Sequence, residues 1–293
     1  MIQIEAVIPE SLVDPLETHF YDLDEVPWMV QQARDEDPYK LVGWFDSEEA
    51  ALLQWCALRN RFPGIPADPV VGVLPDRDWK EAYKEHFRPW VERGLHWVPE
   101  WERATHVVPA GEAAIYLDPG MAFGTGDHPT TRLCAAAILD VRDRLGAQVS
   151  RARVVDAGCG SGILALSAAK LGFGSVEGFD IDPEAVRVSR GNAEANGLGG
   201  RVAFREAGLD GGLKSGPWDL VLANILANIL CANAEVLLRA TAPGGTLALS
   251  GILEREAEQA AAHFQSVADR LGMAVEMRTL VLGEWAGIHI ERY

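Results

Sequence analysis

The stretch RVVDAGCGSGILALSAAKLG, residues 153–172, decides the fold of this 293-residue chain. An apolar run of strand character leads into three closely spaced glycines, and an apolar, helix-like run follows them. Gly158, Gly160 and Gly162 tolerate positive φ and let the backbone approach a ligand closely. A strand, a glycine turn and a helix in this order are typical of the ligand-binding carboxyl edge of an open parallel sheet.

The spacing of these glycines narrows the choice of ligand. Dinucleotide enzymes need GxGxxG, and its third glycine would fall at position 163, which is Ile163. The observed GxGxG instead suits a nucleoside without a pyrophosphate, such as S-adenosylmethionine. A simple tight turn without a ligand is the alternative interpretation of the glycines alone.

Two further strands are predicted to end in polar side chains. The strand SVEGFD ends at Asp180, 22 residues beyond Gly158, where a carboxylate can accept hydrogen bonds from both hydroxyls of a ribose. Asp182 is instead expected to cap the helix that Pro183 opens. The strand DLVLAN ends at Asn224, whose carbonyl oxygen can accept a hydrogen bond from an incoming amine. The alternative for Asn224 is a cap of the helix that follows.

The order of the segments predicts two domains. From about residue 111, strands and helices alternate, which indicates an α/β fold with a parallel, doubly wound sheet. The last two strand-like segments, MAVEMRTLVL and AGIHIERY, have no helix between them, so we expect an antiparallel hairpin at the end. Residues 1–75 have the order βαββαβ of a small ferredoxin-like α+β domain. We therefore expect a recognition domain at 1–75, a linker with short strands at 76–110, and a catalytic domain at 111–293.

Composition and charge argue against several classes of protein. The chain is 48% hydrophobic, which is ample for a packed core, and its formal net charge is −17. This charge disfavours direct binding to nucleic acid and would attract a basic partner, although solubility alone also accounts for it. No apolar run approaches the roughly 18 residues of a membrane span, and the first residues lack a signal-peptide pattern, so we expect a cytoplasmic protein. The spacing of Cys and His indicates neither a metal site nor a disulfide framework.

A second glycine-rich stretch, DPGMAFGTGDHPTTRL at residues 118–133, also precedes an apolar, helix-like run. Together with DAGCGSGILA, GFDIDPEAV and LANILA, it resembles the bacterial PrmA family, the methyltransferases of the large-subunit ribosomal protein L-eleven. The resemblance covers essentially all of residues 78–293, and the βαββαβ pattern before them agrees with the recognition domain of that family. It implies the Rossmann-like sheet of a class I methyltransferase.

The resemblance also implies a reaction and a set of site residues. S-adenosylmethionine would donate methyl groups, and lysine side chains or other amino groups of L-eleven would accept them. The loop that contains Gly124 would fold over the methionine end of the donor, and Phe123 and Asn224 would be the catalytic pair. The residues implied to bind the donor are Thr125, Gly126, Thr131, Gly158, Gly160, Asp180 and Asn224.

Such a transfer is an in-line displacement by a neutral amine, so positioning is the main contribution expected from the protein. We expect no dedicated general base, and His128, just before Pro129, is expected to be a loop or cap residue. A different protein or a small-molecule amine remains an alternative acceptor. A binding module without activity and a nicotinamide oxidoreductase are alternatives of other classes, and Ile163 argues against the second. Glutamine-modifying relatives of the family carry Asn-Pro-Pro-Tyr at this strand end, where this chain has NILA. This difference argues against modification of glutamine.

Overall fold

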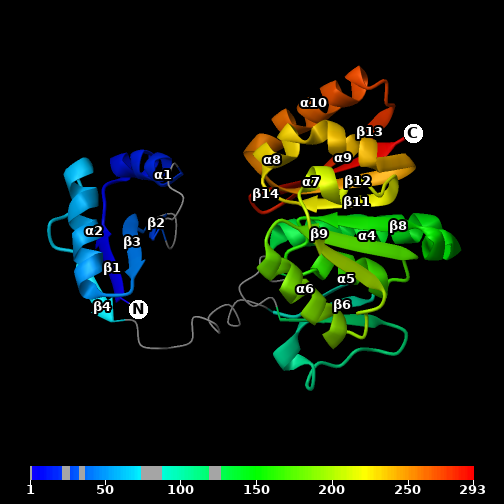
Figure 1. Cartoon of the computed structure of the whole chain (residues 1–293), viewed down its shortest axis with the longest axis horizontal. Helices are drawn as coiled ribbons and strands as arrows, with labels where there is room; N and C mark the ends of the chain where they lie inside the picture. Colours follow the sequence, from blue (N-terminus) through cyan, green and yellow to red (C-terminus); the bar gives the residue numbers. More distant parts are fainter. Residues whose placement is uncertain (1, 22–26, 33–36, 74–87, 119–126) are drawn as a thin grey trace. The chain divides into compact units, whose positions relative to one another are not determined.

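The computed structural model describes residues 2–21, 27–32, 37–73, 88–118 and 127–293 (Figure 1). The chain divides into two compact units, Met1–Glu81 and Ala82–Tyr293. Among the described helices, none is both long enough and apolar enough to cross a membrane.

The described residues of the first unit form a four-stranded antiparallel sheet, two α-helices and one short 3-10 helix (Figure 1). Ser47 caps the second helix, because its side chain accepts a hydrogen bond from the backbone N–H of Ala50. The strand order β2-β3-β1-β4 confirms the ferredoxin-like arrangement expected from the sequence. Ile4, Leu41 and Trp55 are buried in its core. The elements are β1 (Ile2–Val7), η1 (Glu10–Leu12), α1 (Val13–Tyr21), β2 (Trp28–Gln31), β3 (Lys40–Phe45), α2 (Glu48–Arg61) and β4 (Val70–Val73).

The second unit contains a seven-stranded sheet of order β10-β9-β8-β11-β12-β14-β13. The strands from β10 to β12 are parallel neighbours, whereas β14 pairs antiparallel with both β12 and β13. The doubly wound sheet with its closing hairpin is therefore confirmed. The elements are α4 (Pro129–Leu145), η4 (Gly146–Arg151), β8 (Arg153–Ala157), α5 (Ile163–Lys170), β9 (Ser175–Asp180), α6 (Pro183–Ala195), β10 (Val202–Glu206), α7 (Leu209–Gly212), β11 (Trp218–Asn224), α8 (Ala227–Ala232), α9 (Ala234–Ala240), β12 (Thr241–Leu253), α10 (Glu254–Arg270), β13 (Val275–Leu282) and β14 (Trp285–Arg292).

Helices cover both faces of this sheet, which explains why the middle positions of its central strands, such as Val154 and Val155 of β8 and Leu220 to Ala223 of β11, are apolar. Successive residues of a strand point to opposite faces. Val154 accordingly packs in the core with α4, α5 and α6, whereas Val155 packs in the core with α9 and α10. The same alternation places Leu220 and Val221 of β11 in the two different cores.

A small three-stranded sheet belongs to the core of the second unit. It consists of β5 (Trp90–Glu92), β6 (Leu95–Pro99) and β7 (Ala113–Leu117), and the short helix η3 (Glu100–Glu102) follows β6. The indole rings of Trp90 and Trp97 stack with their centroids 3.7 Å apart. The fully buried Trp97 donates a 2.8 Å hydrogen bond from Nε1 to Oγ of Ser167 on α5. The short strands expected between residues 76 and 110 are thus present, and they pack against the large domain.

One helix ends earlier than its sequence indicates. The segment AEVLLRATAPGG predicts a helix that ends at Gly244 and Gly245, but α9 ends at Ala240 and β12 begins at Thr241. Gly245 lies against the start of β11, where an added Cβ would be 3.0 Å from the carbonyl oxygen of Trp218. Gly245 therefore serves the close approach of two strands, and Gly244, with a φ of +76°, adopts a conformation that favours glycine.

We predict that Ser167→Ala lowers the free energy of unfolding of the second unit by about 1–3 kcal/mol, because the buried indole N–H of Trp97 loses its acceptor. Urea denaturation of the full chain measures the change. Ser266→Ala, an exposed serine on α10, is the matched control and should change stability by less than about 0.5 kcal/mol. Equal effects of the two substitutions would show that the Trp97 bond does not stabilise the fold.

Candidate active site

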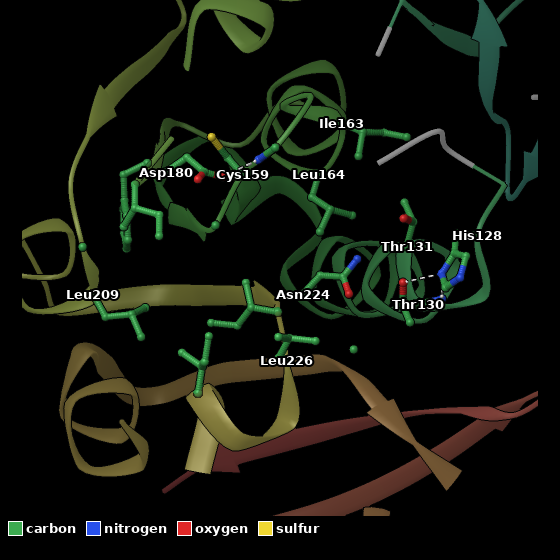
Figure 2. Close-up of a pocket in the computed structure, with 18 of the residues that line it drawn as sticks. His128, Thr130, Thr131, Cys159, Ile163, Leu164, Asp180, Leu209, Asn224 and Leu226 are labelled. Atoms are coloured by element: carbon green, nitrogen blue, oxygen red, sulfur yellow. Dashed lines mark hydrogen bonds between the residues drawn. The ribbon is translucent and has the colours of Figure 1, made fainter. Parts of the chain in front are cut away.

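A pocket of about 470 Å³ opens at the carboxyl ends of the parallel strands in the second unit (Figure 2). The strand order reverses at this place, because β9 and β10 lie on one side of β8 whereas β11 and β12 lie on the other. Ligands of open α/β sheets bind at such a switch point. The pocket brings together the five described residues that the sequence nominated, namely Thr131, Gly158, Gly160, Asp180 and Asn224.

The glycine loop after β8 forms one wall of the pocket. Gly158, Gly160 and Gly162 have φ values of +75°, +51° and +81°, a region that residues with a Cβ rarely adopt. An added Cβ on Gly158 would lie 2.4 Å from Cγ2 of Ile225. Only glycine lets these two pocket-lining segments approach so closely, and the loop thereby exposes backbone to a ligand.

Asp180 ends β9, and its carboxylate is half-buried at the edge of the pocket (Figure 2). Oδ2 accepts a 2.9 Å hydrogen bond from the backbone N–H of Gly160, and Oδ1 accepts one of 3.0 Å from that of Asp182. Each carboxylate oxygen has two lone pairs, so both can still accept a hydrogen bond from a ligand. The side chain of Asp182 accepts a bond from Glu184 N and caps α6, which confirms its expected role.

Asn224 ends β11, and its side chain points into the pocket (Figure 2). The helix that follows begins later, and its N-cap is Leu226. The alternative interpretation of Asn224 as a helix cap is therefore wrong. The carboxamide is held at the strand end and faces the pocket, where its oxygen can accept a hydrogen bond.

Thr131 on the first turn of α4 presents a hydroxyl that lacks a partner among the described residues. The residue is fully buried, and its Oγ1 atom forms no hydrogen bond there. An unsatisfied buried hydroxyl costs about 1–3 kcal/mol. Because Thr131 also lines the pocket, a bound polar group would satisfy it. The orphaned hydroxyl, the glycine loop and the Asp180 carboxylate together fit a nucleoside ligand.

His128 is the N-cap of α4, as expected. Its Nδ1 accepts a long, 3.4 Å hydrogen bond from the backbone N–H of Thr130 and lies 2.7 Å from the hydroxyl of the same residue. Burial lowers the pKa of the imidazole below its usual value. The lone pair on Nδ1 is therefore committed to the helix cap, which leaves this nitrogen poorly suited to remove a proton from a substrate.

The remaining nominated residues, Phe123, Thr125 and Gly126, lie outside the described residues. Within the described part of the chain, no group of three or more His, Cys, Asp or Glu side chains is arranged to hold a metal ion.

Comparison with known proteins supplies the family. The family model described as "Ribosomal protein L11 methyltransferase (PrmA)" matches residues 19–292. The chain belongs to this family. It is 36% identical over 279 residues to the ribosomal protein L11 methyltransferase of Hydrogenovibrio crunogenus, with 90% of each chain covered. It is 45% identical over 236 residues to that of Ralstonia nicotianae, with 78% of this chain and 72% of the relative covered.

Among solved structures, the chain is similar to the crystal structure of the ribosomal protein L11 methylase from Lactobacillus delbrueckii subsp. bulgaricus. The TM-score is 0.58 and the sequence identity is 33%, with 69% of this chain and 96% of the other covered. The resemblance to the PrmA family that the motifs indicated is thus confirmed across both units of the chain.

Asp156, the first residue of the DAGCGSG motif, lies near the end of β8 beside the glycine loop, and the motif alone does not indicate a role for it. It is 1% exposed, and Oδ2 accepts a 3.1 Å hydrogen bond from the backbone N–H of Ala165 on α5. Oδ1 has no hydrogen-bond partner among the described residues. Burial raises the pKa of this carboxyl to about 7, and the nearby Asp180 carboxylate adds to the increase. This hydrogen bond connects β8 to α5, and the glycine loop runs between these two elements.

This pKa predicts a pH dependence of stability. Between about pH 4, the usual pKa of an unfolded aspartate, and about pH 7, the folded protein keeps a proton on Asp156 that the unfolded chain has released. The contribution of Asp156 to the free energy of unfolding is therefore fully present below about pH 4. It is lost as the pH rises through 7, at no more than about 1.4 kcal/mol per pH unit. Asp156→Asn should remove this loss.

Urea denaturation between pH 4 and pH 8 provides the measurement. The free energy of unfolding of Asp156→Asn minus that of the wild type should increase with pH up to about 7 and then stay constant. The same profile for Asp182→Asn, an exposed carboxyl at a helix cap, separates the effect of burial from that of losing one negative charge. Parallel profiles for Asp156→Asn and the wild type would contradict the assignment.

Proposed function

We propose that this chain transfers methyl groups from S-adenosylmethionine to lysine and other amino groups of ribosomal protein L11. One observation carries the proposal: in a chain of this family, a glycine loop, a ribose-type carboxylate, an orphaned hydroxyl and a strand-end amide line one pocket at the switch point of the sheet. Its relatives are named for methylation of L11, and with a ribosomal acceptor the proposed place of the reaction is the cytoplasm.

The residues that would hold the donor follow from their chemistry. The Asp180 carboxylate would accept hydrogen bonds from the two ribose hydroxyls, in line with its place at the end of the strand after the glycine loop. The backbone at Gly158 and Gly160 would lie against the donor, and the Thr131 hydroxyl would bond to one of its polar groups. Thr125 and Gly126 of the second loop are proposed as further contacts, and Phe123 is proposed to cover the reacting end.

The protein would promote transfer by orienting the acceptor. When bound, S-adenosylmethionine supplies an electrophilic methyl group, so nothing further needs to be activated on that side. The Asn224 carbonyl would accept a hydrogen bond from the amine N–H and thereby direct the nitrogen lone pair. Apolar side chains such as Ile225 and Leu226 line the same pocket, and desolvation there lowers the pKa of a lysine toward the neutral form that reacts.

The identity of the acceptor has an alternative. An amine of another protein or of a small molecule could bind to Asn224 in the same way. The net charge of −17 favours a basic macromolecular partner, because opposite charge speeds the encounter. Direct binding to ribosomal RNA is disfavoured by the same charge. A lysine-bearing ribosomal protein fits both conditions.

The test is a methylation assay with labelled S-adenosylmethionine and purified ribosomal protein L11, read by mass spectrometry. We expect label on amino groups of L11, and the masses give the sites and the number of methyl groups. Tight donor binding without label on L11, but with label on another protein, would retain the methyltransferase and overturn the acceptor. Failure to bind the donor in calorimetry would overturn the reaction itself.

Thr131→Val tests how the donor is held, since valine keeps the shape of the side chain and removes the hydroxyl. We expect the Kd for S-adenosylmethionine to rise about fivefold to tenfold, the loss of about one hydrogen bond. Without ligand, stability should stay constant or increase by up to about 1 kcal/mol, because a buried group without a described partner is removed. Calorimetry and thermal unfolding measure the two effects.

Thr130→Val is the matched control, because the hydroxyl of Thr130 is already bonded to His128. Its loss should reduce stability, in contrast to the loss of the Thr131 hydroxyl. A Thr131→Val protein that binds the donor as the wild type does would remove Thr131 from the proposed site.

A further inference from the structure

The mouth of the pocket carries large apolar side chains that the protein leaves in contact with solvent. Leu226 is 63% exposed and Ile229 is 41% exposed, and both line the pocket. Leu226 is the N-cap of α8 and Ile229 lies in its first turn, where the Ile229 N–H donates a 3.0 Å hydrogen bond to the carbonyl oxygen of Leu226. Trp285, at the start of β14, is half-buried and lines the same pocket. Exposed apolar side chains gathered at a pocket mark a binding surface.

These side chains lie beside the amide that would orient the acceptor. Leu226 is two residues after Asn224, and Figure 2 shows the two side chains next to each other, with Asp180 on the opposite wall. The ring of Trp285 contacts His128 edge to face, with centroids 5.1 Å apart. The apolar surface therefore lies on the Asn224 side of the pocket, whereas the ribose-type carboxylate belongs to the far side.

An acidic segment adjoins Trp285. Residues 254–258, EREAE, together with Glu284, contribute four glutamates and a single arginine. Leu253 pairs with Trp285 across the two strands, and the backbone N–H of Glu254 donates a 2.8 Å hydrogen bond to the carbonyl oxygen of Glu284. Glu254 and Glu284 are exposed, and neither carboxylate forms an ion pair within the described part of the chain. The rim on this side is therefore complementary to a basic partner.

We propose that Leu226, Ile229 and Trp285, with Glu254 and Glu284 beside them, form the surface that docks the lysine-bearing segment of the protein acceptor. The apolar side chains contact the methylene stem of the target lysine and its apolar neighbours. The two carboxylates attract the basic residues that flank it. This assignment rests on the proposed function, and it adds where on the catalytic unit the acceptor binds.

The apolar part of the surface is tested with Leu226→Ser and Ile229→Ser in the full-length chain. Steady-state methylation of ribosomal protein L11 should show a KM for L11 raised about tenfold, which corresponds to about 1.4 kcal/mol. The Kd for S-adenosylmethionine, measured by calorimetry, should change less than twofold. Val281→Ser, on β13 and 50% exposed, is the matched control, because Val281 does not line the pocket, and it should leave the KM for L11 unchanged.

The acidic part is tested with the double variant Glu254→Gln and Glu284→Gln. Its KM for L11 should rise about threefold or more at low ionic strength, and the difference from the wild type should shrink as salt shortens the Debye length, about 10 Å at 0.1 M. Glu235→Gln on α9 is the matched control, since Glu235 is exposed, pairs with Arg239 and does not line the pocket. The control should not change the KM at either salt concentration.

Two outcomes would overturn the proposal in distinguishable ways. If Leu226→Ser and Ile229→Ser weaken the binding of S-adenosylmethionine and leave the KM for L11 unchanged, the surface belongs to the donor site, and the proposed function stands. If the wild type binds the donor but transfers no methyl group to L11, the proposed function fails and the docking surface fails with it.

Discussion

The shape of the site depends on the close contact of two glycines with Ile225. An added Cβ on Gly158 would lie 2.4 Å from Cγ2 of Ile225, and one on Gly251 would lie 2.4 Å from its carbonyl oxygen. Both glycines have positive φ, +75° and +84°, so the loop after β8 and the irregular part of β12 close on the end of β11 from two directions. Asn224 precedes Ile225, so these contacts fix the backbone at the strand end from which its side chain enters the pocket.

The electrostatics of the site follow from the same loop. Two carboxyl groups contact its ends: the buried Asp156 bonds to the backbone of α5, and the half-buried Asp180 bonds to the backbone of Gly160. Burial favours the neutral form of the first, whereas the second keeps lone pairs available at the pocket edge. One carboxyl is thus bonded to the helix that follows the loop, and the other lines the pocket. Their different depths explain why two aspartates on neighbouring strands serve different purposes.

Much of the fold was predictable because the sequence patterns reflect direct physical needs. Glycines at 158 and 160, and polar residues at the ends of two apolar strands, indicate the carboxyl edge of a parallel sheet, and strand ends of such a sheet meet by geometry. The cap at Asp182 follows from Pro183 in the same local way. The end of α9 was predicted wrongly because Gly245 packs against the backbone of β11, a long-range contact that local propensity does not report.

Other features of the site required the structure. Trp285 reaches the pocket only because β14 inserts antiparallel beside β12, and the position of β14 in the sheet cannot be read from its sequence. The sequence also did not indicate that Leu226 and Ile229 are exposed, because apolar residues after a buried strand suggest a helix packed in the core. The missing partner of the Thr131 hydroxyl is likewise a property of packing. These residues line the pocket, so sequence motifs located the site but did not define its walls.

The chemistry of the walls explains how transfer can proceed without a dedicated base. A lysine ammonium with a usual pKa of about 10.4 must lose its proton before it can attack, and both burial and a nearby positive charge lower that pKa. An apolar pocket that also holds a cationic donor provides both effects. The lone pair of His128 on Nδ1 is occupied by the cap of α4, and the proton can leave to solvent before the amine enters. Specificity then depends on which lysine can enter the mouth of the pocket and align its amine with the methyl group. Both the choice of lysine and the rate of transfer therefore depend on how the amine is positioned.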